Sequence, residues 1–150
     1  METSSIERRM ALIHSAVRNA DYFEKHQMNQ HQIVEYLLNG VDVQAPSKYF
    51  DWCSLFMMYV TGISPKKQMI DLAARSWLRI GKRKNNPIIG DVVVYWREAP
   101  ESWKGHVGLF VGMEQNKILT LGGNQSSEVN ITPMNPYFLV SYIDIMEVLP

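Results

Sequence analysis

The chain contains one cysteine, Cys53, and its surroundings suit a nucleophile. The apolar residues after it predict a helix that starts near Trp52, which places the thiol in the first turn. Unpaired amide groups and the helix dipole favour a negative charge there. We therefore expect the pKa of this thiol to lie below its free value of about 8.5, especially beside an imidazolium. The alternative is that Cys53 is a small buried hydrophobic residue, a common fate of free cysteine.

His106 is the best candidate for the base that activates this thiol. Of the four histidines, it opens a predicted strand directly after Gly105, whereas the other three lie in polar or amphipathic helical sequence. A residue at the end of a strand points from a rigid support into any cleft that lies there. A general base must come within hydrogen-bond reach of its partner, so we expect Cys53 and His106 to meet.

A third polar group should orient the imidazole by accepting a hydrogen bond from its second nitrogen. The predicted strand 117–121 is followed by Gly122-Gly123-Asn124-Gln125. If this strand pairs antiparallel to the one that carries His106, the segment returns to the histidine's end of the sheet. Asn124 or Gln125 can then reach the ring. The alternative is that Gly-Gly-Asn is merely turn chemistry.

The elements that must position these residues predict an α+β domain. Apolar spacing predicts four helices, over residues 6–17, 30–38, 52–62 and 67–80. Runs of β-branched and aromatic residues predict strands at 91–96, 106–112, 117–121, 129–131 and 139–148. Residues 44–49 are predicted to form a loop. Helices followed by short strands indicate N-terminal helices packed on a C-terminal antiparallel sheet of about five strands, within one domain over residues 1–150.

The composition excludes several classes of protein. Hydrophobic residues make up 46% of the chain and charged residues 20%, which is typical of a globular protein. Fifteen basic and fifteen acidic residues balance, so we expect no nucleic-acid partner, and we predict that Lys82–Lys84 is a solvated loop. One cysteine can form neither an internal disulfide nor a multi-thiolate metal site, and we expect no metal or cofactor.

The sequence also carries expectations about location. No apolar stretch approaches the ~20 residues that span a bilayer, so we expect no membrane insertion. The N-terminus has no basic segment followed by an apolar run, so no Sec signal is visible. We therefore expect a protein made in the bacterial cytoplasm that acts elsewhere only after export by another route.

Four short motifs occur in an order that resembles a known family. They are Trp52-Cys53-Ser54, Gly90-Asp91-Val92-Val93-Val94, Gly105-His106-Val107-Gly108 and Leu121-Gly122-Gly123-Asn124-Gln125. Together they resemble CHAP-type and NlpC-type cysteine hydrolases, papain-like enzymes that cut amide bonds in bacterial peptidoglycan. The resemblance implies a papain-like catalytic core over residues 49–150, preceded by a helical addition over residues 1–48.

The resemblance implies a role for each matching residue. Cys53 is the nucleophile, His106 is the general base and then the acid, and Asn124 is the polar residue on the strand after the histidine. Asp91 matches an acidic residue for which we expect a structural role in a turn. Some CHAP relatives carry a glutamate two positions before the asparagine, and this chain departs from them with Gly122.

The remaining site residues are expected close to the thiol. The backbone amide of Cys53 is the natural first donor to an oxyanion. Substrate contacts and a second donor are expected among four residues, Asp51, Trp52, Gln125 and Trp103. Trp96 can also line a groove for a glycan or peptide, with core packing as the alternative for the tryptophans.

The resemblance implies a cell-wall hydrolase that acts on the muropeptide stem in the periplasm or cell wall. Two settings fit an absent Sec signal, a phage endolysin and a toxin injected by type VI secretion, and the second implies secretion machinery and a cognate immunity protein as partners. Two alternatives stay open. One is a catalytically inactive module that binds peptidoglycan or a protein, and the other is an intracellular amidase or acyltransferase on the same scaffold.

Overall fold

The protein, described here by a computed structural model over residues 2–44 and 51–150, is α+β as the sequence predicts. Its helices are α1 (Glu2–Lys25), α2 (Gln30–Leu38), α3 (Cys53–Thr61) and the short 3-10 helices η1 (Ala74–Arg79) and η2 (Pro136–Phe138). Its strands are β1 (Lys82–Lys84), β2 (Val92–Trp96), β3 (Gly105–Glu114), β4 (Lys117–Gln125), β5 (Glu128–Met134) and β6 (Leu139–Asp144). The predicted loop at 44–49 and the boundary after residue 48 fall on residues 45–50, outside the described part.

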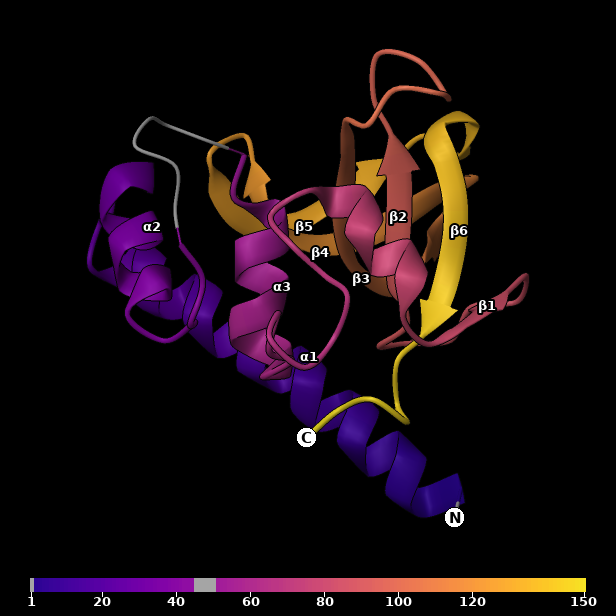
Figure 1. Cartoon of the computed structure of the whole chain (residues 1–150), viewed down its shortest axis with the longest axis horizontal. Helices are drawn as coiled ribbons and strands as arrows, with labels where there is room; N and C mark the ends of the chain where they lie inside the picture. The colour runs from indigo at the N-terminus through magenta and orange to yellow at the C-terminus, as the bar shows by residue number, and fades with distance from the viewer. Residues whose placement is uncertain (1, 45–50) are drawn as a thin grey trace.

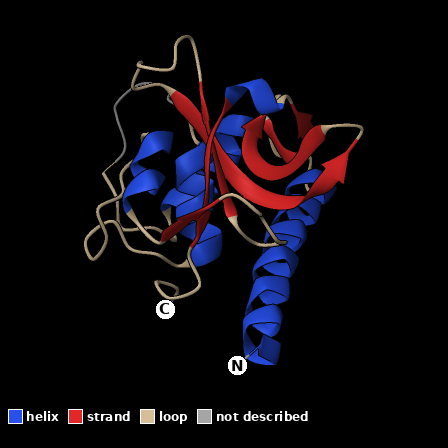
Figure 2. Ribbon diagram, turned by 90° about the vertical axis from the view of Figure 1, so that its right-hand side faces the viewer, coloured by secondary structure: helices blue, strands red, loops and turns tan. Residues whose placement is uncertain are grey.

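The six strands form one antiparallel sheet in the order β1-β6-β2-β3-β4-β5. The sheet is strongly curved (Figure 2), and α3 packs against β3 and β4 on one side of it. Strand β2 is buried from Val92 to Tyr95 because apolar clusters cover both of its faces. One of these clusters contains α3, and the other contains Tyr95, Phe110 and Tyr142.

Helix α3 lies between the sheet and the two N-terminal helices (Figure 1). Its residues from Cys53 to Met58 are all buried, which explains why its sequence is apolar on every side. The helix ends at Gly62, whose φ of 72° is the left-handed conformation that closes many helices. The N-terminal part of α1 extends beyond the body of the protein in both views (Figures 1 and 2).

Two predicted elements are of a different type in the structure. The helix predicted over 67–80 is reduced to η1, because side chains satisfy the backbone groups that a longer helix would pair. Asp71 Oδ1 accepts from the Ala73 amide at 2.8 Å, and Ser76 Oγ accepts from the Asp71 amide at 2.9 Å. The prediction of a solvated loop at Lys82–Lys84 is also wrong, since these residues form β1 at the edge of the sheet. The sheet therefore has six strands rather than about five.

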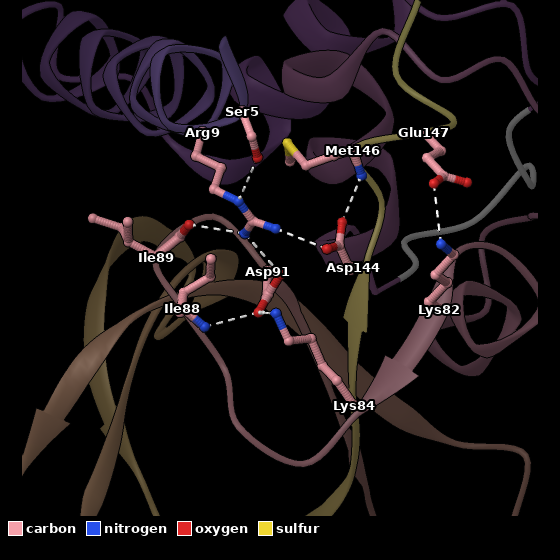
Figure 3. Close-up of polar contacts among 10 residues, drawn as sticks. All are labelled: Ser5, Arg9, Lys82, Lys84, Ile88, Ile89, Asp91, Asp144, Met146 and Glu147. Atoms are coloured by element: carbon pink, nitrogen blue, oxygen red, sulfur yellow. Dashed lines mark hydrogen bonds and ion pairs between the residues drawn. The ribbon is translucent and has the colours of Figure 1, made fainter. Parts of the chain in front are cut away.

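A buried charge cluster fastens α1 to the sheet (Figure 3). Arg9 is only 2% exposed and contacts Asp91 through Nη1 at 2.8 Å and Asp144 through Nη2 at 2.9 Å. Asp91 also pairs with Lys84 at 2.9 Å and accepts from the Ile88 amide at 2.8 Å, which is the structural role in a turn expected for it. This cluster lies where β2 begins, at the opposite end of that strand from the candidate site.

No helix in the described part of the chain combines the length and apolar character needed to cross a membrane.

Candidate functional site

Cys53 is the first residue of α3 and its side chain is 1% exposed. The backbone amides of Val107 and Ser54 lie close enough to lower the pKa of its thiol. Since Val107 follows His106 in β3, the start of α3 lies directly against the strand that carries the histidine. The Ser54 hydroxyl anchors this turn of the helix, because Oγ donates to the Asp71 carbonyl at 2.6 Å and accepts from Trp77 Nε1 at 2.8 Å.

Gly123 allows the helix to approach β4 closely. A Cβ atom at this position would lie 2.7 Å from Phe56 Cβ and 2.8 Å from Trp52 Cζ3, closer than real atoms come. The absence of a side chain at Gly123 therefore sets the distance between α3 and the sheet. This distance in turn fixes the thiol relative to the residues on β3 and β4.

His106 is the second residue of β3, opposite Tyr95 of β2, and it is 5% exposed. Its Nε2 lies 2.9 Å from Gln125 Oε1. The NH₂ group of the Gln125 side chain is also fixed, because Gln125 Nε2 donates to the Thr120 carbonyl at 3.1 Å and to the Asn130 carbonyl at 2.8 Å. Since an amide oxygen only accepts, the neutral imidazole carries its proton on Nε2 and leaves Nδ1 free to accept one.

The resemblance implies Asn124 as the residue next to the histidine, but of Asn124 and Gln125 it is Gln125 that contacts His106. Strand β4 is irregular here, with a register shift between Gly122 and Gln125 and a φ of 57° at Asn124. The irregularity turns the two side chains to different partners. Asn124 Nδ2 donates to Asp51 instead of reaching His106.

The pKa of Cys53 moves in the opposite direction from that predicted. Burial and the nearby Asp51 carboxylate raise it to about 12, and they outweigh the opposing backbone hydrogen bonds and the charge of Arg97. The free-energy penalty of removing water from a thiolate here exceeds the stabilisation that the start of the helix provides. The resting thiol is therefore protonated at neutral pH.

The pKa of His106 is lowered, chiefly by burial. The hydrogen bond to Gln125 and the charge of Asp51 oppose this effect, while Arg97 adds to it. At neutral pH both His106 and Cys53 are consequently uncharged. At neutral pH the site therefore holds no preformed thiolate–imidazolium pair.

Arg97, which follows β2 directly, is a site residue that sequence reasoning missed. Its Nη1 lies 2.5 Å from Asp51 Oδ2, and the other oxygen of Asp51 accepts from Asn124. The charges of Asp51 and Arg97 act on both Cys53 and His106. A single arginine after a strand gives no motif, so only the fold identifies it.

Two neighbouring clefts open beside these residues, and Arg97 lines both. One has a volume of about 440 Å³ and is lined by Cys53, Asp51 and Trp103. The other has a volume of about 460 Å³ and is lined by His106 and Trp96. Cys53 and His106 thus line different clefts, and Arg97, which is paired with Asp51, lines both.

The other residues predicted to contact the substrate differ in whether they are accessible to it. Trp103 is 71% exposed on the rim of the Cys53 cleft, where it can touch a ligand. Trp52 is fully buried, with Nε1 directed at Gln30 Oε1 at 3.4 Å, so it offers no surface to a substrate. The NH₂ group of Gln125 is already engaged, and the Asp51 carboxylate accepts rather than donates, so neither side chain can stabilise an oxyanion. The amide of Cys53 remains the candidate donor.

The loop that carries Trp103 is held by an arginine of η1. Arg75 donates to three carbonyls of the loop, at Lys104 (2.8 Å), Pro100 (2.6 Å) and Ala99 (2.9 Å). These bonds fix the segment between β2 and β3, and with it the rim of the cleft. The rim of the cleft is therefore held in a defined position by the fold.

Within residues 2–44 and 51–150, no three His, Cys, Asp or Glu side chains come together in a way that could hold a metal ion. The site brings together a thiol, an imidazole, an amide, a carboxylate and a guanidinium. A scan against protein-family models gives no match for this chain, and a search of curated proteins gives none either.

Proposed function

We propose that this protein is a papain-like cysteine hydrolase that cuts amide bonds of bacterial peptidoglycan. The observation that supports it best is the 2.9 Å hydrogen bond between His106 Nε2 and Gln125 Oε1. It leaves Nδ1 free to act as a base, on the strand whose next backbone amide, that of Val107, lowers the pKa of the Cys53 thiol. Peptidoglycan as the substrate rests on the ordered motifs that resemble CHAP-type and NlpC-type enzymes.

The mechanism follows from the neutral state of the pair. As Sγ of Cys53 bonds to the amide carbon, its proton passes to Nδ1 of His106, and the carbonyl π electrons move to oxygen. Gln125 Oε1 stabilises the resulting imidazolium through the proton on Nε2. The imidazolium then protonates the leaving amine as the C–N bond breaks and a thioester forms. His106 next takes a proton from water, which attacks the thioester and releases the acid and the free thiol.

The oxyanion forms beside the first turn of α3. The amide of Cys53 has no partner within the helix at this position, so it can donate to the oxygen. One such donor typically contributes about 3 kcal/mol to transition-state stabilisation. The anchoring of Ser54 by Asp71 and Trp77 keeps this amide in place while charge develops.

One observation favours a second candidate, a module that binds peptidoglycan without cutting it. A buried thiol with a pKa of about 12 is a weak nucleophile at rest. Slow alkylation of Cys53 by iodoacetamide at neutral pH is therefore expected of both candidates and does not separate them. Separation requires a measurement of bond cleavage.

Expression with a periplasmic signal peptide tests the proposal. We expect the wild type to lyse the cells, whereas Cys53→Ala and His106→Ala do not, because each lacks one partner of the proton transfer. The same three proteins, purified and incubated with sacculi, are then compared by mass spectrometry of the soluble fragments. Wild type should release fragments with a new amine and a new carboxylate.

Each outcome decides between the candidates. Lysis by all three proteins would refute Cys–His catalysis. Binding to sacculi without fragments from the wild type would identify a binding module, and acyl transfer without stem-peptide release would identify an acyltransferase. Lysis restricted to periplasmic expression fits both an endolysin and an injected toxin as the natural setting.

A further inference from the structure

The position of Arg97 is suited to contact a substrate on either side of the bond that is cut. It is the first residue after β2, and its backbone amide donates to the Lys104 carbonyl at 3.2 Å, which fixes its Cα. It lines the cleft of Cys53 as well as that of His106. A bond attacked by the thiol and protonated by the imidazole must lie between these clefts, next to the guanidinium.

The Arg97 guanidinium has N–H groups that can donate hydrogen bonds to a ligand between the two clefts. Within the described residues, its contact to another side chain is made through Nη1 to Asp51, at 2.5 Å, and Nη2 and Nε have no protein acceptor. The Arg97 side chain is 52% exposed, so these donors can be reached from the clefts. Asn124 holds the far oxygen of Asp51, and this contact steadies the pair without using the guanidinium.

The same chain shows how an arginine with these contacts can hold two carboxylates. Arg9 binds Asp91 through Nη1 and Asp144 through Nη2, at 2.8 and 2.9 Å. Arg97 holds one carboxylate in the same way, through Nη1, and no other residue of the described chain occupies the other side of its fork. A planar guanidinium matches a carboxylate better than any neutral group, because it can offer two parallel N–H donors.

We propose that Arg97 binds a carboxylate of the substrate, so that the preferred substrate is a peptide amide with a free carboxylate next to the bond that is cut. This inference rests on the proposed amide hydrolysis and adds its substrate class. The other cation of the Cys53 cleft, Lys104, is already paired with Glu98 at 2.7 Å and does not contact Asp51. Recognition is therefore assigned to hydrogen bonds of Arg97 rather than to the general charge of the cleft.

The test compares two synthetic muropeptides that differ only in the carboxylate nearest the cut bond, free in one and a carboxamide in the other. We expect the wild type to show a kcat/KM about 10-fold higher for the free carboxylate, the size of one exposed charge-assisted contact. Arg97→Gln should bring the ratio close to one while still cutting the carboxamide, and Arg97→Lys should give an intermediate ratio. Lys104→Gln, which removes the same charge from the same cleft, should keep the wild-type ratio.

The ratio isolates recognition, because any effect of Arg97 on the pKa values of Cys53 and His106 changes the rate for both peptides equally. Equal rates for the two peptides in the wild type would overturn the inference and leave the hydrolase proposal intact. Loss of the preference in Lys104→Gln to the same extent as in Arg97→Gln would overturn it as well. If the wild type cuts neither peptide and releases nothing from sacculi, the proposed function fails and this inference falls with it.

Discussion

Replacement of Gln125 by methionine should disable the site by releasing His106. The change keeps the length and volume of the side chain but removes four polar contacts, one to His106, one to the Thr120 carbonyl and two to Asn130. At about 1 kcal/mol for each buried hydrogen bond, partly offset by the apolar replacement, we expect a loss of about 3 kcal/mol in the free energy of unfolding.

The effect on catalysis comes from the lost acceptor at Nε2. The hydrogen bond to Gln125 raises the pKa of His106 against the effect of burial, so the variant should lower this pKa further. A hydrogen bond to a charged imidazolium contributes about 1.5–3 kcal/mol, which corresponds to a loss of about 10- to 100-fold in kcat/KM. Histidine titration by NMR, denaturant unfolding and muropeptide cleavage measure the three effects.

Asn124→Gly is the matched control on the neighbouring residue. It removes one contact to Asp51, whose side chain is 42% exposed, and glycine adopts the φ of 57° found at this position without strain. We expect a change in stability within about 1 kcal/mol and a smaller effect on the pKa of His106. A large loss of activity in Asn124→Gly, combined with normal activity and a normal His106 pKa in Gln125→Met, would refute the assignment of Gln125.

Three further predictions concern the frame of the site and its titration. Burial raises the pKa of Cys53 to about 12, so the contribution of the neutral thiol to stability is complete below the free pKa of about 8.5 and is lost as the pH rises toward 12. The free energy of unfolding should fall by up to about 1.4 kcal/mol per pH unit over this range. Urea unfolding should show this slope in the wild type and a shallower one in Cys53→Ala, and equal slopes would contradict the prediction. Arg9→Met removes one of the positive charges paired with the fully buried Asp91 carboxylate, and it should lower the free energy of unfolding by about 3–5 kcal/mol in the same assay. A loss below about 1 kcal/mol would argue against a stabilising role of the cluster. Gly123→Ala should cost about 1–3 kcal/mol and reduce amide cleavage by pushing α3 away from β4, whereas Gly112→Ala, where a Cβ meets nothing within 4 Å, should do neither.

The local pattern of the sequence is sufficient for much of the fold. Alternation and β-branched runs place five of the six strands, and the helix around Cys53 begins within one residue of its predicted start. The prediction fails at 67–80, where Asp71 and Ser76 bond to the backbone and limit the helix to η1. It also fails at Lys82–Lys84, because an edge strand gains its pairing from β6 and not from its own residues.

The sequence by itself determined that one thiol lies at a helix start, that one histidine opens a strand, and that Asn124 or Gln125 returns to it. Only the tertiary structure decided between these two, since an irregularity in β4 sets the direction in which each side chain points. The protonation state of Cys53 could likewise not be predicted from the sequence, because the desolvation that raises its pKa depends on all the residues packed around the thiol. Arg97 has no motif at all, and its place beside the thiol and the imidazole exists only because β2 ends where two clefts meet.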